Sequence, residues 1–135
     1  MMFKRKIYQT LLRRKEENQG KKAILIEGAR RVGKTTVVKA FAENEYESSL
    51  IIDFSKVTDT VKEYFRIHIG DLNTLFMLLQ AEFGIQLVEK HSVIVFDEVQ
   101  FCPKAREAIK HLVADGRYDY IETGSLISIR DNVKD

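Results

Sequence analysis

A glycine-rich segment near the N-terminus constrains this 135-residue chain more than any other feature. It places a glycine, four further residues and then Gly-Lys-Thr in a row, a pattern typical of loops that wrap around phosphate groups. Glycine suits this task, because the backbone N–H groups point inward and a Cβ would crowd the phosphate. The segment with the threonine that follows it reads Gly28, Ala29, Arg30, Arg31, Val32, Gly33, Lys34, Thr35, Thr36. We therefore predict that these residues bind the phosphates of a nucleotide.

The side chains of this loop have distinct expected roles. The ammonium of Lys34 would contact the β- and γ-phosphates, the hydroxyl of Thr35 would bind Mg²⁺, and Thr36 would reach the α-phosphate. A helix that begins at Lys34 would direct the positive end of its dipole at the same anion. Arg30 and Arg31 would either contact a phosphate of this or a neighbouring subunit's nucleotide or point to water, and the sequence leaves both alternatives open.

The residues around the loop support this interpretation. The apolar run 23–26 precedes it and predicts a short buried parallel strand. Residues 35–41 follow it with the pattern of a half-buried helix. A strand, a glycine-rich loop and a helix in this order form the structural context that a phosphate-binding loop requires.

A second chemical feature follows the apolar run 93–96, where two acids, Asp97 and Glu98, stand side by side. This pattern predicts a central strand that presents carboxylates at its carboxyl end, where parallel sheets bind ligands. Asp97 would hold Mg²⁺ through water. Glu98 would polarise the water that attacks the γ-phosphate. The acidic pair favours a hydrolytic ATPase over a nucleotide kinase or a GTPase.

Four segments together resemble a known family, the AAA-type ATPases of archaea and bacteria that carry a C-terminal domain of unknown function. These segments are 26–35, 50–55, 96–100 and 121–125. The resemblance implies an α/β fold, a P-loop NTPase three-layer sandwich with a mainly parallel sheet of the additional-strand, RecA/AAA-like type. It implies ATP and Mg²⁺ as ligands and assigns Lys34, Thr35, Asp97 and Glu98 the roles given above. It also makes Thr123 and Ser125 the sensor of the γ-phosphate.

Relatives of this kind continue well past position 135, through the rest of the ATPase core. We therefore expect residues 1–22 to form a basic amphipathic helix with a connector, and residues 23–135 to form a partial ATPase core that stops after the sensor strand. Such truncation affects hydrolysis more than binding. The remaining patterns predict strands over 50–54 and 118–122 and helices over 61–65, 72–83 and 103–115.

The missing strand has a consequence for assembly. In the usual strand order of this fold, the first strand would lie between the sensor strand and a later fifth strand. Without that fifth strand, the first strand would be an exposed apolar edge, which favours self-association with a second copy.

Positive charge is concentrated at the N-terminus. Residues 1–39 contain twelve Lys and Arg against three Glu, whereas residues 40–135 contain ten basic and seventeen acidic residues. The basic side of the N-terminal helix either contacts nucleic acid or an acidic partner, or is a solvated face beside a basic ATP site. No aromatic interleaving or zinc-finger spacing supports nucleic acid.

Composition argues against a membrane protein, a secreted protein and a histidine metal site. No apolar run approaches the length of a membrane span, and the basic start lacks the apolar stretch of a signal peptide. The single cysteine, Cys102, is compatible with a reducing cytoplasm. The three histidines are scattered, which argues against a histidine metal site. Two functions remain open: an ATP hydrolase with ADP and phosphate as products, or a nucleotide-binding switch or interaction module with negligible turnover.

Overall fold

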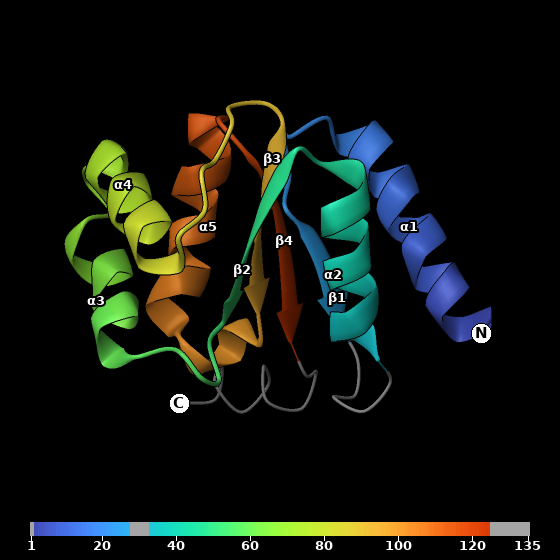
Figure 1. Ribbon diagram of the computed structural model, residues 1–135, viewed down its shortest axis with the longest axis horizontal. Coiled ribbons are helices and arrows are strands. Elements are labelled where there is room, and N and C mark those ends of the chain that lie inside the picture. The colour runs from blue at the N-terminus through green and yellow to red at the C-terminus, as the bar shows by residue number, and fades with distance from the viewer. Residues whose placement is uncertain (1, 28–32, 125–135) are drawn as a thin grey trace.

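The computed structural model describes residues 2–27 and 33–124, and within these ranges it is an α/β structure of three layers (Figure 1). The central sheet has four parallel strands: β1 (Ile24–Glu27), β2 (Ser48–Asp53), β3 (Ser92–Asp97) and β4 (Asp119–Gly124). This confirms the α/β class and the parallel sheet predicted from the sequence.

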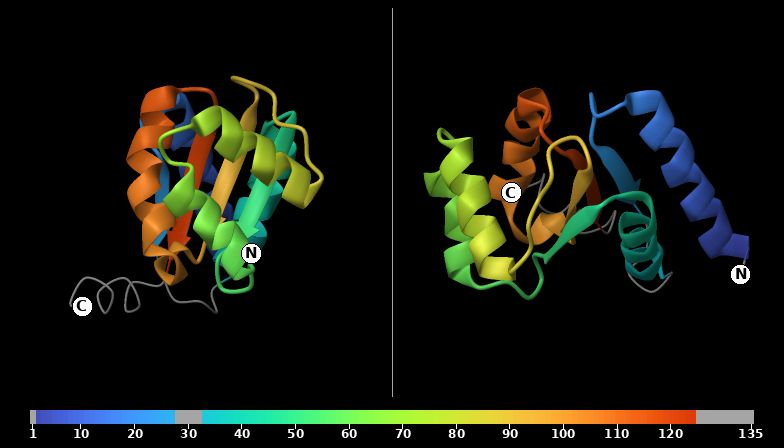
Figure 2. Two further views of the ribbon diagram at one scale, coloured as in Figure 1. Left: turned by 90° about the vertical axis from the view of Figure 1, so that its left-hand side faces the viewer. Right: turned by 45° about the horizontal axis from the view of Figure 1, so that its top comes forward.

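Helices cover both faces of the sheet. One face carries α1 (Met2–Asn18) and α2 (Lys34–Glu45), and the other carries α3 (Asp59–Ile67), α4 (Leu72–Phe83) and α5 (Pro103–Asp115), as Figures 1 and 2 show. A short 3₁₀ helix, η2 (Val99–Phe101), joins β3 to α5. No helix in the described ranges is both long and apolar enough to cross a bilayer.

The order of the strands across the sheet is β1-β4-β3-β2. β4, the last of the four described strands in sequence, therefore lies between β1 and β3, and it brings the glycine-rich segment close to the acidic pair Asp97 and Glu98. In register, Leu25 pairs with Glu122, and Phe96 pairs with the same residue from the other side. Among the described residues, no strand pairs with the outer edge of β1, as the sequence predicted.

Local sequence signals explain where the helices begin and end. The side chain of Asp71 accepts a hydrogen bond from the N–H of Thr74, as expected for the cap of α4. Pro103 occupies the first turn of α5, where its missing N–H costs nothing. Gly84 and Gly116 end α4 and α5 in the left-handed conformation, with φ of 64° and 80°. α5 spans the predicted residues.

Some predicted boundaries were displaced. Of the residues 1–22 expected to form a helix and a connector, α1 takes those through Asn18 and leaves a short connector. The helix expected over 35–41 and the strand expected over 50–54 are longer than predicted, because α2 extends to Glu45 and β2 begins at Ser48. The carboxylate of Glu45 accepts a 2.8 Å hydrogen bond from Tyr8, so contact with α1 supports this last turn. Local propensity alone does not report such contacts.

Candidate functional site

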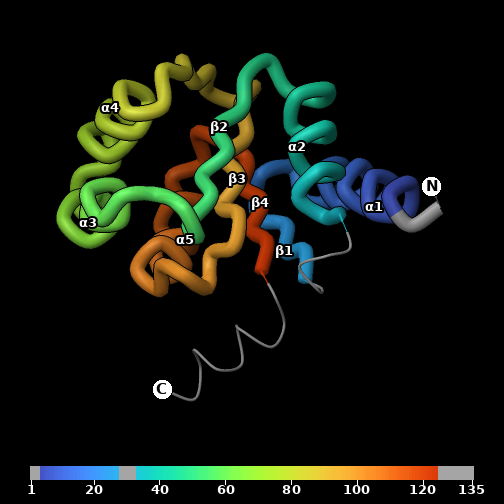
Figure 3. The backbone as a smooth tube through the Cα atoms, turned by 60° about the horizontal axis from the view of Figure 1, so that its bottom comes forward, coloured from blue at the N-terminus to red at the C-terminus, as the bar shows by residue number. Residues whose placement is uncertain are grey.

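The carboxyl ends of β3 and β4 lie near the start of α2 (Figure 3). The residues that the sequence predicted to act on a nucleotide meet there. Side chains on a strand alternate between faces, so Val93 and Val95 point to the α1–α2 face and Asp97 follows them on the same side. On β4, Ile121 and Thr123 follow the same rule. On this face, Asp97 therefore follows the apolar side chains of β3, and Thr123 follows the apolar side chain of β4.

Two hydroxyls bind the carboxylate of Asp97. Thr35 Oγ1 lies 3.2 Å from Asp97 Oδ1 and 3.4 Å from Oδ2. Thr123 Oγ1 donates to Asp97 Oδ1 at 2.5 Å and accepts from the N–H of Glu98 at 3.0 Å. Thr123 therefore fixes both acids of the pair. In this arrangement its single hydroxyl proton goes to Asp97, so contact with a γ-phosphate would require that hydrogen bond to break.

Glu98 contacts the lysine of the glycine-rich loop. Its Oε2 lies 3.7 Å from Lys34 Nζ, and its Oε1 accepts a 2.7 Å hydrogen bond from Gln100 Nε2. Its backbone is left-handed, with φ of 53°, which is uncommon for a residue with a Cβ. This conformation ends β3 and turns the chain into η2, and such local strain is often found at functional sites.

These charged groups are withdrawn from water. Lys34 is 1% exposed, Asp97 3% and Glu98 6%. In such an environment each charge interacts more strongly with its neighbours than it would in solvent, and burial without a partner would be costly. The contacts above supply those partners. The arrangement therefore combines a buried ammonium, two carboxylates and two hydroxyls at one point of the sheet edge.

Several predicted residues lie elsewhere or outside the described ranges. Thr36 is exposed in the first turn of α2. Gly33 precedes α2 with φ of 77°, a conformation that glycine adopts without strain. The segment 28–32, which includes both loop arginines, and the sensor candidate Ser125 lie outside the described residues.

Two other residues have structural explanations. Asp53 ends β2 and accepts hydrogen bonds from the N–H and hydroxyl of Ser55, at 3.0 and 2.6 Å. This is a local turn and needs no ligand. Cys102 is buried, and burial raises the pKa of its thiol, so the group stays protonated and poorly reactive.

Few described side chains could bind a metal ion. Within the part of the chain that the structure describes, no group of three or more His, Cys, Asp or Glu side chains could hold a metal ion. A divalent cation would therefore rely on Thr35 and Asp97, with its remaining positions filled by water and phosphate. Mg²⁺ is usually bound in this way.

Sequence reasoning assigned no role to two residues of this region. Gln100, which holds Glu98, lies in a segment that was noted only for its resemblance. Lys4 lies against Gly33, where a Cβ built on the glycine would be 3.0 Å from Lys4 Cε. The run of basic residues at the N-terminus was the available signal, but it gave no indication of which surface they would contact.

Comparison with known proteins identifies the family. Neither the curated proteins nor the solved structures gave a match to this chain. A family model described as "AAA domain" matches residues 20–133, most of the chain. This membership indicates nucleotide binding, and it agrees with the parallel sheet and the polar edge described above. The chain therefore belongs to the AAA domain family of P-loop ATPases.

Proposed function

We propose that this protein binds Mg-ATP and that the complete active protein hydrolyses it to ADP and phosphate. One observation carries the proposal: the glycine-rich segment contacts the acidic pair at the end of β3. Lys34 Nζ lies 3.7 Å from Glu98 Oε2, and Thr35 Oγ1 lies 3.2 Å from Asp97 Oδ1. In P-loop enzymes a threonine and an aspartate in such positions hold Mg²⁺ together. Family membership supports the nucleotide-binding part.

Thr35 and Asp97 are the proposed ligands of Mg²⁺. A hydroxyl and a carboxylate whose oxygens lie 3.2 Å apart supply the hard oxygen donors that this cation prefers. When bound, Mg²⁺ neutralises charge on the phosphate oxygens. Thr123 would act by holding Asp97 in place through its 2.5 Å hydrogen bond.

The phosphates would be bound by the loop from Gly28 to Gly33 and by Lys34, with Thr36 at the α-phosphate. Lys34 has a second task in this proposal. Its ammonium lies near Glu98 in the structure, and it would exchange part of this interaction for the β- and γ-phosphates. Occupation of the loop would thereby free the carboxylate of Glu98.

Glu98 is the proposed general base. A water oxygen would form a bond to the γ-phosphorus while the bond between that phosphorus and the bridging oxygen of ADP breaks. The proton of the water would pass to the Glu98 carboxylate. Gln100 would orient this carboxylate through its 2.7 Å hydrogen bond.

A nucleotide-binding switch with negligible turnover is the second candidate. The pairing of Glu98 with Lys34 favours it, because the ammonium engages the carboxylate that would otherwise contact the attacking water. In this case nucleotide would order a neighbouring segment and a partner would read the change.

Calorimetric titration of Mg-ATP tests the binding proposal. The native chain should bind, and Lys34→Ala should lose at least about a hundredfold in affinity, because several charge-assisted hydrogen bonds disappear. Lys39→Ala is the matched control, since it removes the same charge from an exposed position of α2. Equal affinities of the two variants would contradict the proposal. Phosphate release by the native chain, absent in Glu98→Gln, would separate hydrolysis from a switch.

We further propose that the outer edge of β1 supports self-association. Ile26 is only partly buried on this strand, and β4 is its one strand partner among the described residues. Unpaired edges of this kind template pairing with a second chain. Light scattering over a range of concentrations should show a rising mass, and a constant monomer mass would contradict this proposal.

A further inference from the structure

The N-terminal helix is held firmly against the helix that carries the phosphate-loop lysine. Leu11 of α1 is fully buried in the core that it shares with α2. The ring of Tyr8 meets Phe41 edge to face, with centroids 5.4 Å apart, and its hydroxyl donates to Glu45 at 2.8 Å. The first turn of α1 therefore has a defined position, and Figures 1 and 3 place it beside the start of α2.

At that position Lys4 covers the last glycine of the phosphate loop. A Cβ built on Gly33 would lie 3.0 Å from Lys4 Cε and 3.8 Å from Lys4 Nζ. Gly33 directly precedes Lys34, so the ammonium of Lys4 stands next to the backbone that is proposed to contact phosphate. In this respect α1 contributes to the candidate site, although it lies outside the glycine-rich motif.

Two grooves flank this contact, and both have basic residues of α1 on one wall. One groove, of about 300 Å³, is lined by Lys6 and Thr10 of α1, by Ile26 and Glu27 of β1 and by Lys34. The other, of about 350 Å³, is lined by Lys4, Arg5 and Gln9 of α1 and by Thr36 and Ala40 of α2. Within the described residues, neither Lys4 nor Lys6 forms an ion pair with a carboxylate.

We infer that Lys4 is an additional phosphate-binding residue that acts on the phosphates nearest the nucleoside. This inference rests on the proposed function. The assignment follows from position: Asp97 and Glu98 contact the start of α2 from β3, whereas Lys4 reaches it from α1, on the side of Gly33 and Thr36. The γ-phosphate would lie on the side of Asp97 and Glu98. Lys4 therefore serves ADP and ATP equally.

The same position explains part of the basic N-terminal face. A cation beside a phosphate loop attracts the nucleotide, so the charge has a local purpose. A nucleic acid would instead contact the exposed basic residues along the helix, such as Arg5, Arg13 and Arg14. The contact of Lys4 with Gly33 and the groove that Lys6 shares with Lys34 favour the nucleotide.

Titration of Mg-ATP and of Mg-ADP into Lys4→Gln tests this inference. The affinity for both nucleotides should fall by the same factor, about tenfold, which is the typical contribution of a hydrogen bond to a charged group. Lys4→Arg should recover most of it. Arg13→Gln is the matched control, because Arg13 is an exposed residue of the same helix, 3.5 Å from Glu17, and the substitution removes the same charge. Its affinity should stay within about twofold of the native value.

The outcomes separate this inference from the proposal on which it rests. If Lys4→Gln binds both nucleotides as Arg13→Gln does while Lys34→Ala does not bind, the inference fails and the proposed function stands. If the native chain binds no nucleotide, both fail. Loss of ATP affinity alone would overturn the assignment to the inner phosphates. Weaker binding of a fluorescent single-stranded oligonucleotide, with nucleotide affinity unchanged, would instead identify the basic face as a nucleic-acid surface and overturn the inference.

Discussion

The two faces of the sheet are built from the same strands but differ in character. The face under α3, α4 and α5 is apolar and rich in aromatic rings along most of its length. The face under α1 and α2 is mainly aliphatic and ends in Asp97 and Thr123. Because side chains alternate along a strand, one row can stabilise the fold while the next row provides the chemistry.

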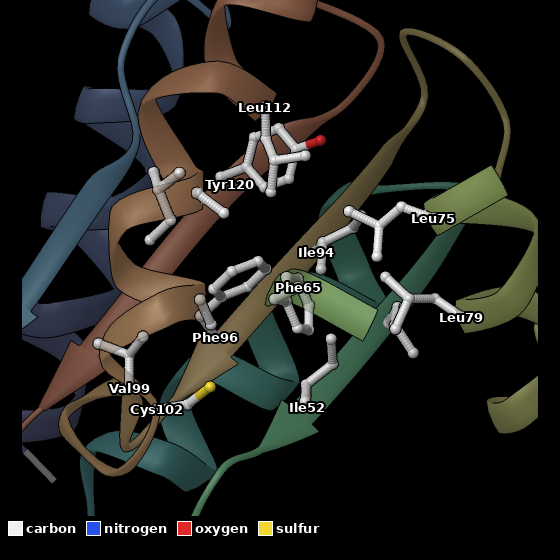
Figure 4. Packing of buried hydrophobic residues seen from close by; sticks show 14 of the residues in the cluster. Ile52, Phe65, Leu75, Leu79, Ile94, Phe96, Val99, Cys102, Leu112 and Tyr120 are labelled. Atoms are coloured by element: carbon white, nitrogen blue, oxygen red, sulfur yellow. The ribbon is translucent and has the colours of Figure 1, made fainter. Parts of the chain in front are cut away.

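The aromatic face shows how the fold is stabilised. The ring of Phe96 on β3 lies 5.4 Å from Phe54, which directly follows β2. It lies 5.4 Å from Phe65 on α3 and 6.1 Å from Tyr120 on β4, and Figure 4 shows these three rings. Edge-to-face and tilted contacts of this kind add to the gain from burial. The cluster joins β2, β3, β4 and α3, so its loss should be felt throughout the domain.

The polar end of the other face shows how function can be added at little cost to folding. On this face of β3, Val93 and Val95 are buried in the core, and Asp97 comes only at the end of the strand. A carboxylate in the middle of the strand would lack partners, whereas at the edge two hydroxyls reach it. The comparison predicts that substitutions on the aromatic face change stability and substitutions at the polar end change chemistry.

The largest effect on stability is expected for Phe96→Ala. Removal of a fully buried ring from the centre of the aromatic face should cost about 3–5 kcal/mol of the free energy of unfolding. Chemical denaturation measures this loss. Met77→Ala on α4 is the control, because Met77 is 59% exposed and its truncation should change stability by less than about 0.5 kcal/mol. Equal effects of the two variants would contradict the assigned role of this face.

Glu98→Gln should have the largest effect on chemistry. Turnover should fall about 10²–10⁴-fold, the usual contribution of a general base, while Mg-ATP binding is retained. Binding is expected to survive because Lys34 loses a competing carboxylate and keeps its phosphates. Steady-state phosphate release and calorimetry measure the two quantities. Glu89→Gln, at an exposed position, should change neither; a loss of turnover in both variants would rule out a specific role for Glu98.

Thr123→Val tests a residue that is expected to affect both stability and chemistry. The variant keeps the shape but removes a hydroxyl that donates to Asp97 and accepts from the N–H of Glu98. We expect a loss of about 1–3 kcal/mol in stability, because a buried N–H is left without its acceptor. Turnover should fall as well, because both acids lose a fixed position.

The control for Thr123→Val is Ile121→Val, two residues earlier on β4, where the side chain points to the same face of the sheet. It should cost about 0.5–1.5 kcal/mol of stability and leave the affinity for Mg-ATP unchanged. Denaturation curves and nucleotide titrations of both variants make the comparison. Normal turnover in Thr123→Val would show that its hydrogen bonds do not position the acids.

The smallest effect, and one that depends on pH, is expected for Glu122→Gln. Burial raises the pKa of the Glu122 carboxyl; the charge of Arg106 opposes this, and that of Glu27 adds to it. The folded state therefore retains this proton at a higher pH than the unfolded state does. Its contribution to stability is present below the ordinary glutamate pKa and is lost as pH rises through the raised value. Removing the charge should thus stabilise the protein at neutral pH.

Denaturation near pH 4 and near pH 8 tests the Glu122 prediction. The variant should gain stability over the native chain only at the higher pH. Glu43→Gln, at an exposed position of α2, should show no such difference. A gain of equal size at both values would show that the effect comes from packing and not from ionisation.

The sequence by itself predicted most of the architecture, because the relevant signals are local. The α/β class followed from the resemblance that four local segments carry, and Asp71, Pro103 and Gly116 marked helix ends through their own backbone preferences. The spacing of Gly28, Gly33 and Lys34 is also a local signal, and it predicted a phosphate loop. Boundaries that depend on neighbours, such as the last turn of α2, were less well predicted.

The sequence also named the chemical residues of the site, and only the tertiary structure decided how they meet. Insertion of β4 between β1 and β3 brings Thr123 to Asp97, across 26 positions of the chain. Packing of α1 on α2 brings Lys4 to Gly33. Neither contact leaves a trace in the local pattern, because each depends on strand order and helix docking. Residue types state which chemistry a chain can perform, whereas distances between remote residues arise only when the core is formed.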